Sequence, residues 1–293
     1  MPWTEQPPRL DVAIVGTGRA GAVIGAAFVR AGHRVMACTA VSDLSRLRAE
    51  SLLPGVAIVP VREAVADRDL VVLAVPDDAL ADLVQGLATT NAIGPGTFVV
   101  HLSGRYGTEV LEPLAALGAL PLALHPVMTF TGTSIDLARL SGCAFGITAP
   151  DALRPVAEAL VVELGGEPVW VAQQFRSLYH AALAFGANGI ATLANETVTL
   201  LSHAGIDDAA TVIAPLLSAS LDNALRNSDA ATTGPAVRGD ARTVAAHLVA
   251  LAGQHLRTVP AYREVTRLTV TRAREARVLR DDAADAVLAE LRD

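Results

Sequence analysis

Between residues 11 and 171, short apolar runs alternate with longer amphipathic stretches. Several runs are apolar almost throughout, which is typical of strands buried on both faces of a sheet. The stretches between them have helical periodicity, and this alternation predicts an α/β fold with a mostly parallel, doubly wound sheet. We expect strands at Val12–Val15, Arg34–Cys38, Val56–Val59, Leu70–Val75, Thr97–Leu102, Leu120–Leu124, Cys143–Thr148 and Val169–Val171, and helices that include Gly18–Ala31, Asp77–Leu87, Thr108–Leu117 and Asp151–Leu164.

The pattern changes after Trp170. No further strand is indicated, and Gln173–His203 has the composition of one long helix, with Gly205 behind it as a stop signal. The sequence therefore predicts a sheet domain at residues 1–171 and an all-helical domain at residues 172–293. Within the second domain we expect further helical stretches at Asp207–Asn223, Asp240–Leu251 and Ala261–Leu291, and a loop at Arg226–Gly239.

The first predicted strand leads into a complete G-x-G-x-x-G turn just before a predicted helix. Gly16 permits the tight turn, Gly18 lets the backbone approach a pyrophosphate, and Gly21 lets the helix pack close to the strand. The start of the helix offers N–H groups and a positive dipole end to phosphates. The turn therefore predicts a dinucleotide-binding, Rossmann-type sheet, with a glycine turn that has lost its ligand as the alternative. Its residues are Gly16, Thr17, Gly18, Arg19, Ala20 and Gly21.

The end of the second predicted strand bears on the choice of cofactor. NAD sites carry an acidic residue about 20 positions after the glycine turn, which bonds the ribose 2′-hydroxyl, and this strand end has none. Thr39, Ser42, Ser45 and Arg46 are available there for a 2′-phosphate. We therefore expect NADP rather than NAD, and a deazaflavin cofactor stays open. In the alternative interpretation, Ser42 and Asp43 cap the next helix and Arg46 is a solvated side chain.

Composition excludes several classes of function. All 23 basic residues are arginine, which excludes lysine Schiff-base enzymes and P-loop NTPases. The net charge of −7 argues against a nucleic-acid-binding surface. No stretch approaches the roughly 18 apolar residues of a membrane span, and the N-terminus lacks the apolar core of a signal peptide. Two cysteines form neither a disulfide framework nor a zinc site. We therefore expect a cytoplasmic protein without metal, membrane or nucleic-acid partners.

Polar residues stand at the carboxyl ends of the predicted strands, the edge at which doubly wound sheets bind ligands. Val75 and Pro76 close the fourth strand and are suited to border the cofactor. Ser103, after the fifth strand, is placed to meet the nicotinamide and a substrate carboxylate. His101 and His125 end the fifth and sixth strands. The alternatives are that Ser103 caps the next helix, that His101 is a core histidine bonded to backbone, and that His125 holds the turn behind it.

The predicted helical domain carries polar groups on an otherwise apolar helix, where they need partners or serve a ligand. Together with the motifs of the first domain, these polar residues make the chain resemble the Rossmann-like two-domain oxidoreductases of largely unassigned function. These belong to the superfamily of 6-phosphogluconate and β-hydroxyacid dehydrogenases, ketopantoate reductase and pyrroline-5-carboxylate reductase. The resemblance spans almost the whole chain and implies a helical domain that commonly dimerises and an active site between the domains. Besides the glycine turn, it is carried by Val75-Pro76-Asp77, His101-Leu102-Ser103-Gly104, Leu124-His125-Pro126, Tyr179-His180 with Asn188, and Thr233–Asp240.

One departure from the superfamily concerns its acid/base. Many hydroxyacid members carry a lysine on the first long helix of the second domain, with an asparagine one turn later. If Asn188 is that asparagine, Ala184 stands at the lysine position. If His180 replaces the lysine, Asn188 lies two turns on, about 12 Å along the helix axis. Both alignments remove the lysine.

Other groups are available for catalysis. His180 suits proton donation to a carbonyl oxygen, Arg238 suits a bidentate clamp on a carboxylate, and Asp240 suits the orientation of either. The alternatives are a helix-interface histidine satisfied by Tyr179 or backbone, an N-cap at Asp240, and a simple Arg238–Asp240 pair.

We therefore expect a homodimeric NADP-dependent oxidoreductase that acts on a small carboxylate-bearing carbonyl compound, with a ketopantoate-type 2-keto acid as the best guess. The proton would come from His180 or from a water held by Asn188, while Ser103 and Arg238 position the substrate. An imine reductase of the pyrroline-5-carboxylate reductase type is the second hypothesis, because an imine can arrive already protonated. A dinucleotide-sensing or scaffold protein without catalysis is the third.

Overall fold

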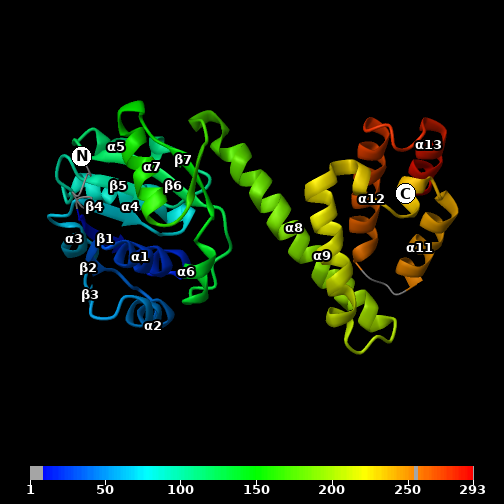
Figure 1. The fold of residues 1–293 in the computed structure, drawn as a ribbon, viewed down its shortest axis with the longest axis horizontal. Helices are drawn as coiled ribbons and strands as arrows, with labels where there is room; N and C mark the ends of the chain where they lie inside the picture. Colours follow the sequence, from blue (N-terminus) through cyan, green and yellow to red (C-terminus); the bar gives the residue numbers. More distant parts are fainter. Residues whose placement is uncertain (1–8, 254–256, 293) are drawn as a thin grey trace, which may run out of the picture. The chain divides into compact units, whose positions relative to one another are not determined.

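The computed structural model describes residues 9–253 and 257–292, which form two compact units. The first unit ends at Gly186 and the second begins at Ala187, both inside the long helix α8 (Arg176–His203) (Figure 1). The predicted domain boundary at residue 172 falls earlier, where the sheet has ended, and stays a prediction. Each unit is described by itself below.

The first unit is built on one eight-stranded sheet with the order β3-β2-β1-β4-β5-β6-β7-β8. All neighbours are parallel except β6 and β7, which are antiparallel. All eight predicted strands are present, and β6 runs further than predicted, through His125 to Pro126. The strands are β1 (Asp11–Val15), β2 (Arg34–Cys38), β3 (Ala57–Ile58), β4 (Leu70–Leu73), β5 (Phe98–His101), β6 (Leu120–Pro126), β7 (Ala144–Thr148) and β8 (Glu167–Trp170).

Helices cover both faces of this sheet, as the doubly wound prediction requires (Figure 1). Side chains alternate along each strand, so Val12 and Ile14 pack against α1 and α7, while Ala13 and Val15 face the opposite core with α4. The helices are α1 (Arg19–Ala31), α2 (Asp43–Leu52), α3 (Val61–Val65), α4 (Asp77–Thr89), α5 (Glu112–Ala115), α6 (Ile135–Arg139) and α7 (Arg154–Glu163), with 3-10 turns at Thr108–Leu111, Asp151–Leu153 and Gln173–Phe175.

The second unit is helical, and its core joins Val244 of α11, Val270 of α12 and Val287 of α13. The single stretch predicted at Ala261–Leu291 is wrong in one respect: it is two helices, which separate where Arg277 takes a left-handed φ of 59°. The predicted loop Arg226–Gly239 contains a 3-10 turn, Ser228–Ala231, and a short helix. The helices after α8 are α9 (Ala209–Asn227), α10 (Pro235–Arg238), α11 (Ala241–Gly253), α12 (Thr258–Glu275) and α13 (Asp281–Glu290).

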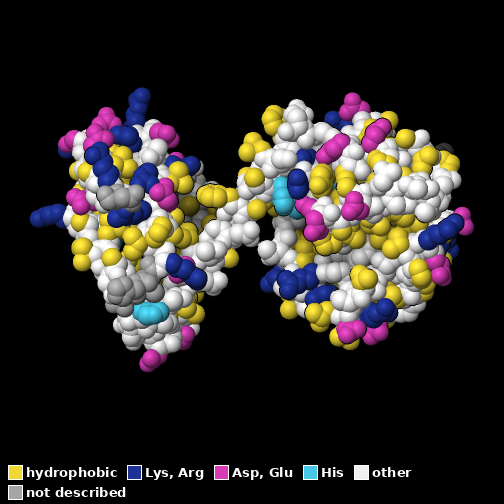
Figure 2. Space-filling view, turned by 180° about the vertical axis from the view of Figure 1, so that it is seen from behind, with side chains coloured by type: hydrophobic (Ala, Val, Ile, Leu, Met, Phe, Trp, Pro, Cys, Tyr) yellow, Lys and Arg dark blue, Asp and Glu magenta, His cyan; other side chains and the backbone are white. Residues whose placement is uncertain are grey.

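The helices α8 and α9 expose much of their apolar surface. Arg176 is the one buried residue of α8, and Ala209 is the one buried residue of α9. Apolar side chains are visible on the surface of both units in Figure 2. No described helix is long and apolar enough to cross a membrane. The large exposed apolar residues of α8 and α9 are Leu178, Phe185, Ile190, Leu193, Val212, Leu216, Leu221 and Leu225.

Candidate active site

The glycine turn joins β1 to α1 at the carboxyl edge of the sheet. Gly16 has a φ of 97°, and a Cβ on it would lie 2.6 Å from the Ala74 carbonyl oxygen. A Cβ on Gly21 would overlap the Gly16 carbonyl oxygen. Gly18, the N-cap of α1, has open space where a Cβ would lie. The turn therefore leaves bare backbone at the start of a helix, the arrangement that accepts a phosphate.

The end of β2 is tied to this turn by hydrogen bonds. The Gly16 N–H donates to Thr39 Oγ1 at 2.8 Å, and Thr17 Oγ1 donates to the carbonyl oxygens of Thr39 and Ser45 at 2.9 and 3.1 Å. Ser42 caps α2 in a reciprocal capping box with Ser45. Ser42 is therefore a helix cap, as the alternative interpretation of the sequence has it. Arg46 is exposed.

A cavity of about 310 Å³ lies beside the glycine turn, between the ends of β1, β2 and β4. Its lining is mainly apolar and includes Val41, Val61, Val75 and Leu83. Pro76 follows Val75 as the N-cap of α4. The cavity lies within the range of small-ligand pockets, roughly 300–1,000 Å³.

A second group of polar residues gathers around Gly104, just after β5. A Cβ on Gly104 would lie 2.9 Å from His125 Nε2 and 2.9 Å from His180 Cδ2. The ring centroids of His125 and His180 are 6.1 Å apart, and the Tyr179 hydroxyl lies 2.8 Å from His125 Nδ1. All of these residues belong to the first unit. We call Ser103, Gly104, His125, Tyr179 and His180 the histidine cluster.

Two members of the β5 end are held by local hydrogen bonds. His101 is fully buried; its Nε2 lies 2.7 Å from the Gly107 carbonyl oxygen, and its Nδ1 accepts the Ser103 N–H at 3.2 Å. Burial lowers the pKa of His101 to about 4. His101 is therefore a core histidine bonded to backbone, which was the alternative to a role in the site. Ser103 Oγ accepts the N–H groups of Arg105 and Tyr106 at 3.1 and 3.3 Å, and it therefore shapes the turn that carries Gly104.

Beneath the histidine cluster lies a buried guanidinium, Arg176, which is 1% exposed. Its Nε donates to Thr148 Oγ1 at 2.7 Å, and its Nη2 donates to the carbonyl oxygens of Ala123 and Gly146, both at 3.0 Å. Its Nη1 reaches the Ser103 carbonyl oxygen at 3.5 Å. Burial lowers the pKa of Arg176 to about 10, which leaves it charged at neutral pH.

The His125–Tyr179 pair sits next to this charge. Burial, and then the charge of Arg176, lower the pKa of His125 to about 4. Burial raises the pKa of Tyr179. At neutral pH the pair is therefore an uncharged imidazole hydrogen-bonded to an uncharged phenol. One alternative from the sequence was a hydrogen bond between Tyr179 and His180. In the structure the Tyr179 phenol is instead hydrogen-bonded to His125.

The remaining predicted catalytic residues lie in the second unit. Asn188 is exposed on α8, and Arg238 is exposed at the end of α10. Asp240 caps the start of α11, as the alternative interpretation has it. Its carboxylate accepts the Thr243 N–H at 3.1 Å and the Thr243 hydroxyl at 2.6 Å. These bonds to Thr243 lower the pKa of Asp240. The histidine cluster thus contains Ser103, His125 and His180, and the roles of all six predicted catalytic residues stay predictions.

Sequence reasoning missed Arg176. Nothing distinguishes it in the sequence from the other arginines, since its partners are the Thr148 hydroxyl and carbonyl oxygens that β6, β7 and the segment after β5 bring together. A usable signal was its place at the first turn of an apolar helix, where a charge needs partners.

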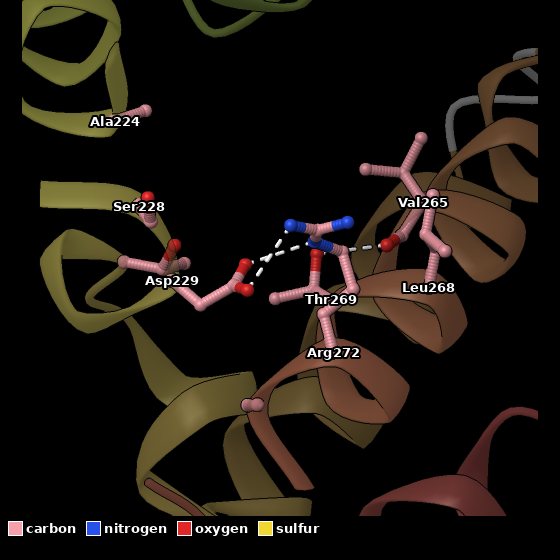
Figure 3. Close-up of a pocket in the computed structure, with 9 residues that line it drawn as sticks. Ala224, Ser228, Asp229, Val265, Leu268, Thr269 and Arg272 are labelled. Atoms are coloured by element: carbon pink, nitrogen blue, oxygen red, sulfur yellow. Dashed lines mark hydrogen bonds and ion pairs between the residues drawn. The ribbon is translucent and has the colours of Figure 1, made fainter. Parts of the chain in front are cut away.

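The second unit has a pocket of its own, shown in Figure 3. Its volume is about 360 Å³, and α12 supplies Val265, Leu268 and Arg272 to its wall. Arg272 Nε and Nη2 bind the carboxylate of Asp229 at 2.8 and 3.0 Å. Over the described ranges, no group of three or more histidine, cysteine or acidic side chains is arranged to hold a metal.

Comparison with family models divides the chain in two. Residues 3–126 match a family described as a Rossmann-like domain, and residues 143–269 match DUF2520, a domain of unknown function. The chain thus matches a Rossmann-like family over its N-terminal part and DUF2520 over its C-terminal part. No curated protein matches it significantly. The residues of the histidine cluster fall in both matched segments. Ser103 and His125 lie in the segment that matches the Rossmann-like family, and His180 lies in the segment that matches DUF2520.

Solved structures show the same fold over nearly the whole length of both domains. A Bacteroides fragilis protein, provisionally described as an NADP oxidoreductase, has a TM-score of 0.71 at 21% identity, over 91% of this chain and 97% of its own. An imine reductase from Streptomyces aurantiacus has a TM-score of 0.65 at 18% identity, over 97% and 100%. A pyrroline-5-carboxylate reductase from Coxiella burnetii has a TM-score of 0.53 at 17% identity, over 93% and 100%. The expected fold, a Rossmann-type sheet followed by a helical domain, is confirmed.

Proposed function

We propose that this protein is an NADP-dependent oxidoreductase that reduces a small carboxylate-bearing carbonyl compound. The observation that carries the proposal is the placement of two features on one sheet edge. The glycine turn follows β1, while the histidine cluster includes residues at the ends of β5 and β6. In the order β1-β4-β5-β6, β5 lies two strand spacings from β1, about 10 Å. A cofactor held at the turn would extend along this edge toward the cluster.

The residues at the glycine turn fit a dinucleotide. Bare backbone at Gly18 accepts the pyrophosphate, and the apolar cavity bordered by Val75 suits an adenine ring. No acidic side chain ends β2, which favours NADP over NAD. Because Ser42 is engaged in its capping box, exposed Arg46 is the side chain best suited to a 2′-phosphate. A fold relative, the pyrroline carboxylate reductase of Plasmodium falciparum, has NADP bound, at a TM-score of 0.55 and 10% identity.

A bound nicotinamide would supply the hydride for a carbon–oxygen or carbon–nitrogen double bond. The protein's own groups must then orient the substrate and protonate its oxygen or nitrogen. The uncharged His125 ring is a hydrogen-bonding group for that atom, and the buried positive charge of Arg176 favours an anionic substrate. His180, half-buried beside Gly104, is placed to deliver a proton from solvent.

The assignment of His180 has a direct test. With the true substrate, His180→Ala should lower kcat about 100-fold or more, in line with general acid catalysis, while the Kd for NADPH stays unchanged. His203→Ala, on the last turn of the same helix, is the matched control. An unchanged rate in His180→Ala would make His180 a structural residue, and water held by Asn188 would become the preferred proton source.

The second candidate is reduction of an imine. It is favoured because His125 and Tyr179 supply no ready acid at neutral pH: His125, with a pKa of about 4, is already deprotonated, the pKa of Tyr179 is raised, and the chain has no lysine. A protonated imine needs no such acid. Imine and pyrroline-5-carboxylate reductases among the fold relatives support this candidate.

A panel assay separates these possibilities. Oxidation of NADPH and NADH is followed with ketopantoate, simple 2-keto acids, pyrroline-5-carboxylate and a neutral cyclic imine. Turnover of keto acids supports the leading proposal, and turnover of imines alone supports the second candidate. NADPH binding without any turnover supports a dinucleotide-sensing protein. Failure to bind either nucleotide contradicts the proposal as a whole.

We further propose that the protein is a homodimer formed through α8 and α9. Apolar helices that bury almost none of their residues need a partner surface. Light scattering should give twice the chain mass of 30.3 kDa. The double variant Leu216→Asp with Leu225→Asp should give a monomer, whereas Ile135→Asp, equally exposed on α6, should not. A monomeric wild-type protein would overturn this.

A further inference from the structure

The partners of Arg176 are all uncharged. They are the Thr148 hydroxyl and the carbonyl oxygens of Ser103, Ala123 and Gly146. These acceptors come from β6, β7 and the segment after β5, so one side chain joins the sheet edge to the first turn of α8. Since carbonyl dipoles solvate the cation without neutralising it, its charge acts on neighbouring groups.

Tyr179 stands one turn further along α8, within reach of this charge. The Arg176 guanidinium lies 5.7 Å from the centre of the Tyr179 ring. A Cβ on Gly146 would overlap the Tyr179 hydroxyl, so the absent side chain makes room for the phenol. An uncharged imidazole has one nitrogen that accepts a hydrogen bond, so the phenol can donate its proton to His125 Nδ1, 2.8 Å away.

The groups around His125 all disfavour a second positive charge there. Arg176 and the rings of His180 and His101 act against protonation of His125, as burial does. The acidic groups nearby act elsewhere: Glu109 interacts with Arg176, and Asp77 interacts with His101. His125 Nδ1 faces the phenol, and Nε2 faces Gly104.

We propose that Arg176 is a positioning residue that keeps His125 uncharged and fixes Tyr179 as donor to Nδ1, so that the Nε2–H of His125 faces the substrate. The part that concerns substrate rests on the proposed function. In that reaction His125 donates a hydrogen bond to the carbonyl oxygen of the substrate and holds it in place. It does not abstract a proton, and the proton that adds to the product comes from another group.

The test begins with the wild-type chain and needs neither cofactor nor substrate. Protein labelled with ¹⁵N and ¹³C in histidine is titrated from pH 8 to about pH 3.5, so that a midpoint near 4 is covered, and His125→Asn identifies the His125 signal. We expect His125 to stay uncharged to pH 5 with its proton on Nε2. A midpoint near 6.5, or a proton on Nδ1, would overturn the proposal. Since no ligand is added, this result is separate from any failure of the proposed function.

Variants then test the role of the charge. Arg176→Met removes the charge at similar volume, and it should raise the midpoint of His125 by about one pH unit or more. Thr148→Val removes one acceptor of Arg176 and keeps the charge, so the midpoint should not move. A folded Arg176→Met protein with an unchanged midpoint refutes the inference. If Arg176→Met does not fold, Tyr179→Phe is the deciding variant. Loss of the phenol should abolish the preference of the His125 proton for Nε2 over Nδ1. An unchanged preference counts against the inference.

Discussion

One buried and one half-buried histidine, His101 and His125, should make the first unit sensitive to mild acid. The pKa of each falls from 6.5 to about 4 on folding, mainly through burial. The unfolded chain therefore binds more protons than the folded chain between pH 6.5 and pH 4. The stability from these rings is fully present above pH 6.5 and is lost progressively as the pH falls toward 4.

The size of the effect follows from these shifts. Each histidine should remove about 1.4 kcal/mol of unfolding free energy per pH unit within that window. At pH 5.0, about 1.5 units below the unfolded pKa, each costs about 2 kcal/mol, and the two together cost about 4 kcal/mol. This is a large part of the roughly 5–15 kcal/mol that stabilises a typical domain.

Urea unfolding at pH 7.5, 6.0 and 5.0 measures this loss. Tryptophan fluorescence reports on the first unit through Trp170, which lies in β8. His101→Gln and His125→Asn, singly and together, remove the titrating rings. Each protein loses some unfolding free energy between pH 7.5 and pH 5.0. The difference in this loss between wild type and the double variant is the contribution of the two histidines, without that of the other titrating groups.

The expected result is that the double variant loses about 4 kcal/mol less than wild type over this range, and each single variant about half of that. An equal loss in all four proteins would refute the reasoning, because the rings would then titrate alike in the folded and unfolded states. A change in one single variant alone would show which of the two rings is buried uncharged.

Three further perturbations follow from the geometry. Gly18→Asp places a carboxylate in the open space at the start of α1; it should weaken NADPH binding at least tenfold in a fluorescence titration, with the circular dichroism spectrum unchanged. Gly104→Ala brings a methyl group to 2.9 Å from both His125 Nε2 and His180 Cδ2; turnover should fall at least tenfold while the Kd for NADPH stays the same, and a fall in both would place the cluster in cofactor binding. Asp136 is fully buried and accepts the N–H groups of Thr131 and Gly132 at 2.7 and 2.8 Å. Asp136→Asn puts an amide donor against these donors and should lower the melting temperature by about 5 °C, whereas Asp151→Asn, at an exposed carboxylate, should not.

The fold was largely predictable because its signals are local. Each strand is a short apolar run, and the glycine turn needs the backbone freedom of Gly16, whose φ is positive. The break between α12 and α13 was not predictable in this way. The residues Ala276–Arg280 include no glycine or proline, and Arg277 takes the left-handed conformation there.

The site was predictable in part. Ser103 and His125 were found because the carboxyl ends of parallel strands share an edge, and His180 because it is polar on an apolar helix. The part played by Arg176 depends on carbonyl oxygens from three separate segments, and no local pattern encodes that convergence. The partner of Tyr179 was missed for the same reason: His125 lies on a strand 54 residues earlier in the chain.

The antiparallel pairing of β7 with β6 sets how far the candidate site extends beyond the edge of the sheet. β6 is paired with β5 as far as Ala123, and beyond that point its pairing with β7 carries His125 and Pro126 further. A strand rises about 3.3 Å per residue and alternates its faces. Inserting two residues into this paired extension would therefore move the His125 ring outward by about 7 Å on the same face, whereas one residue would turn it away. The length of a hairpin-like ribbon, rather than the shape of a loop, is thus the variable through which a protein engineer would fit this scaffold to longer or shorter substrates.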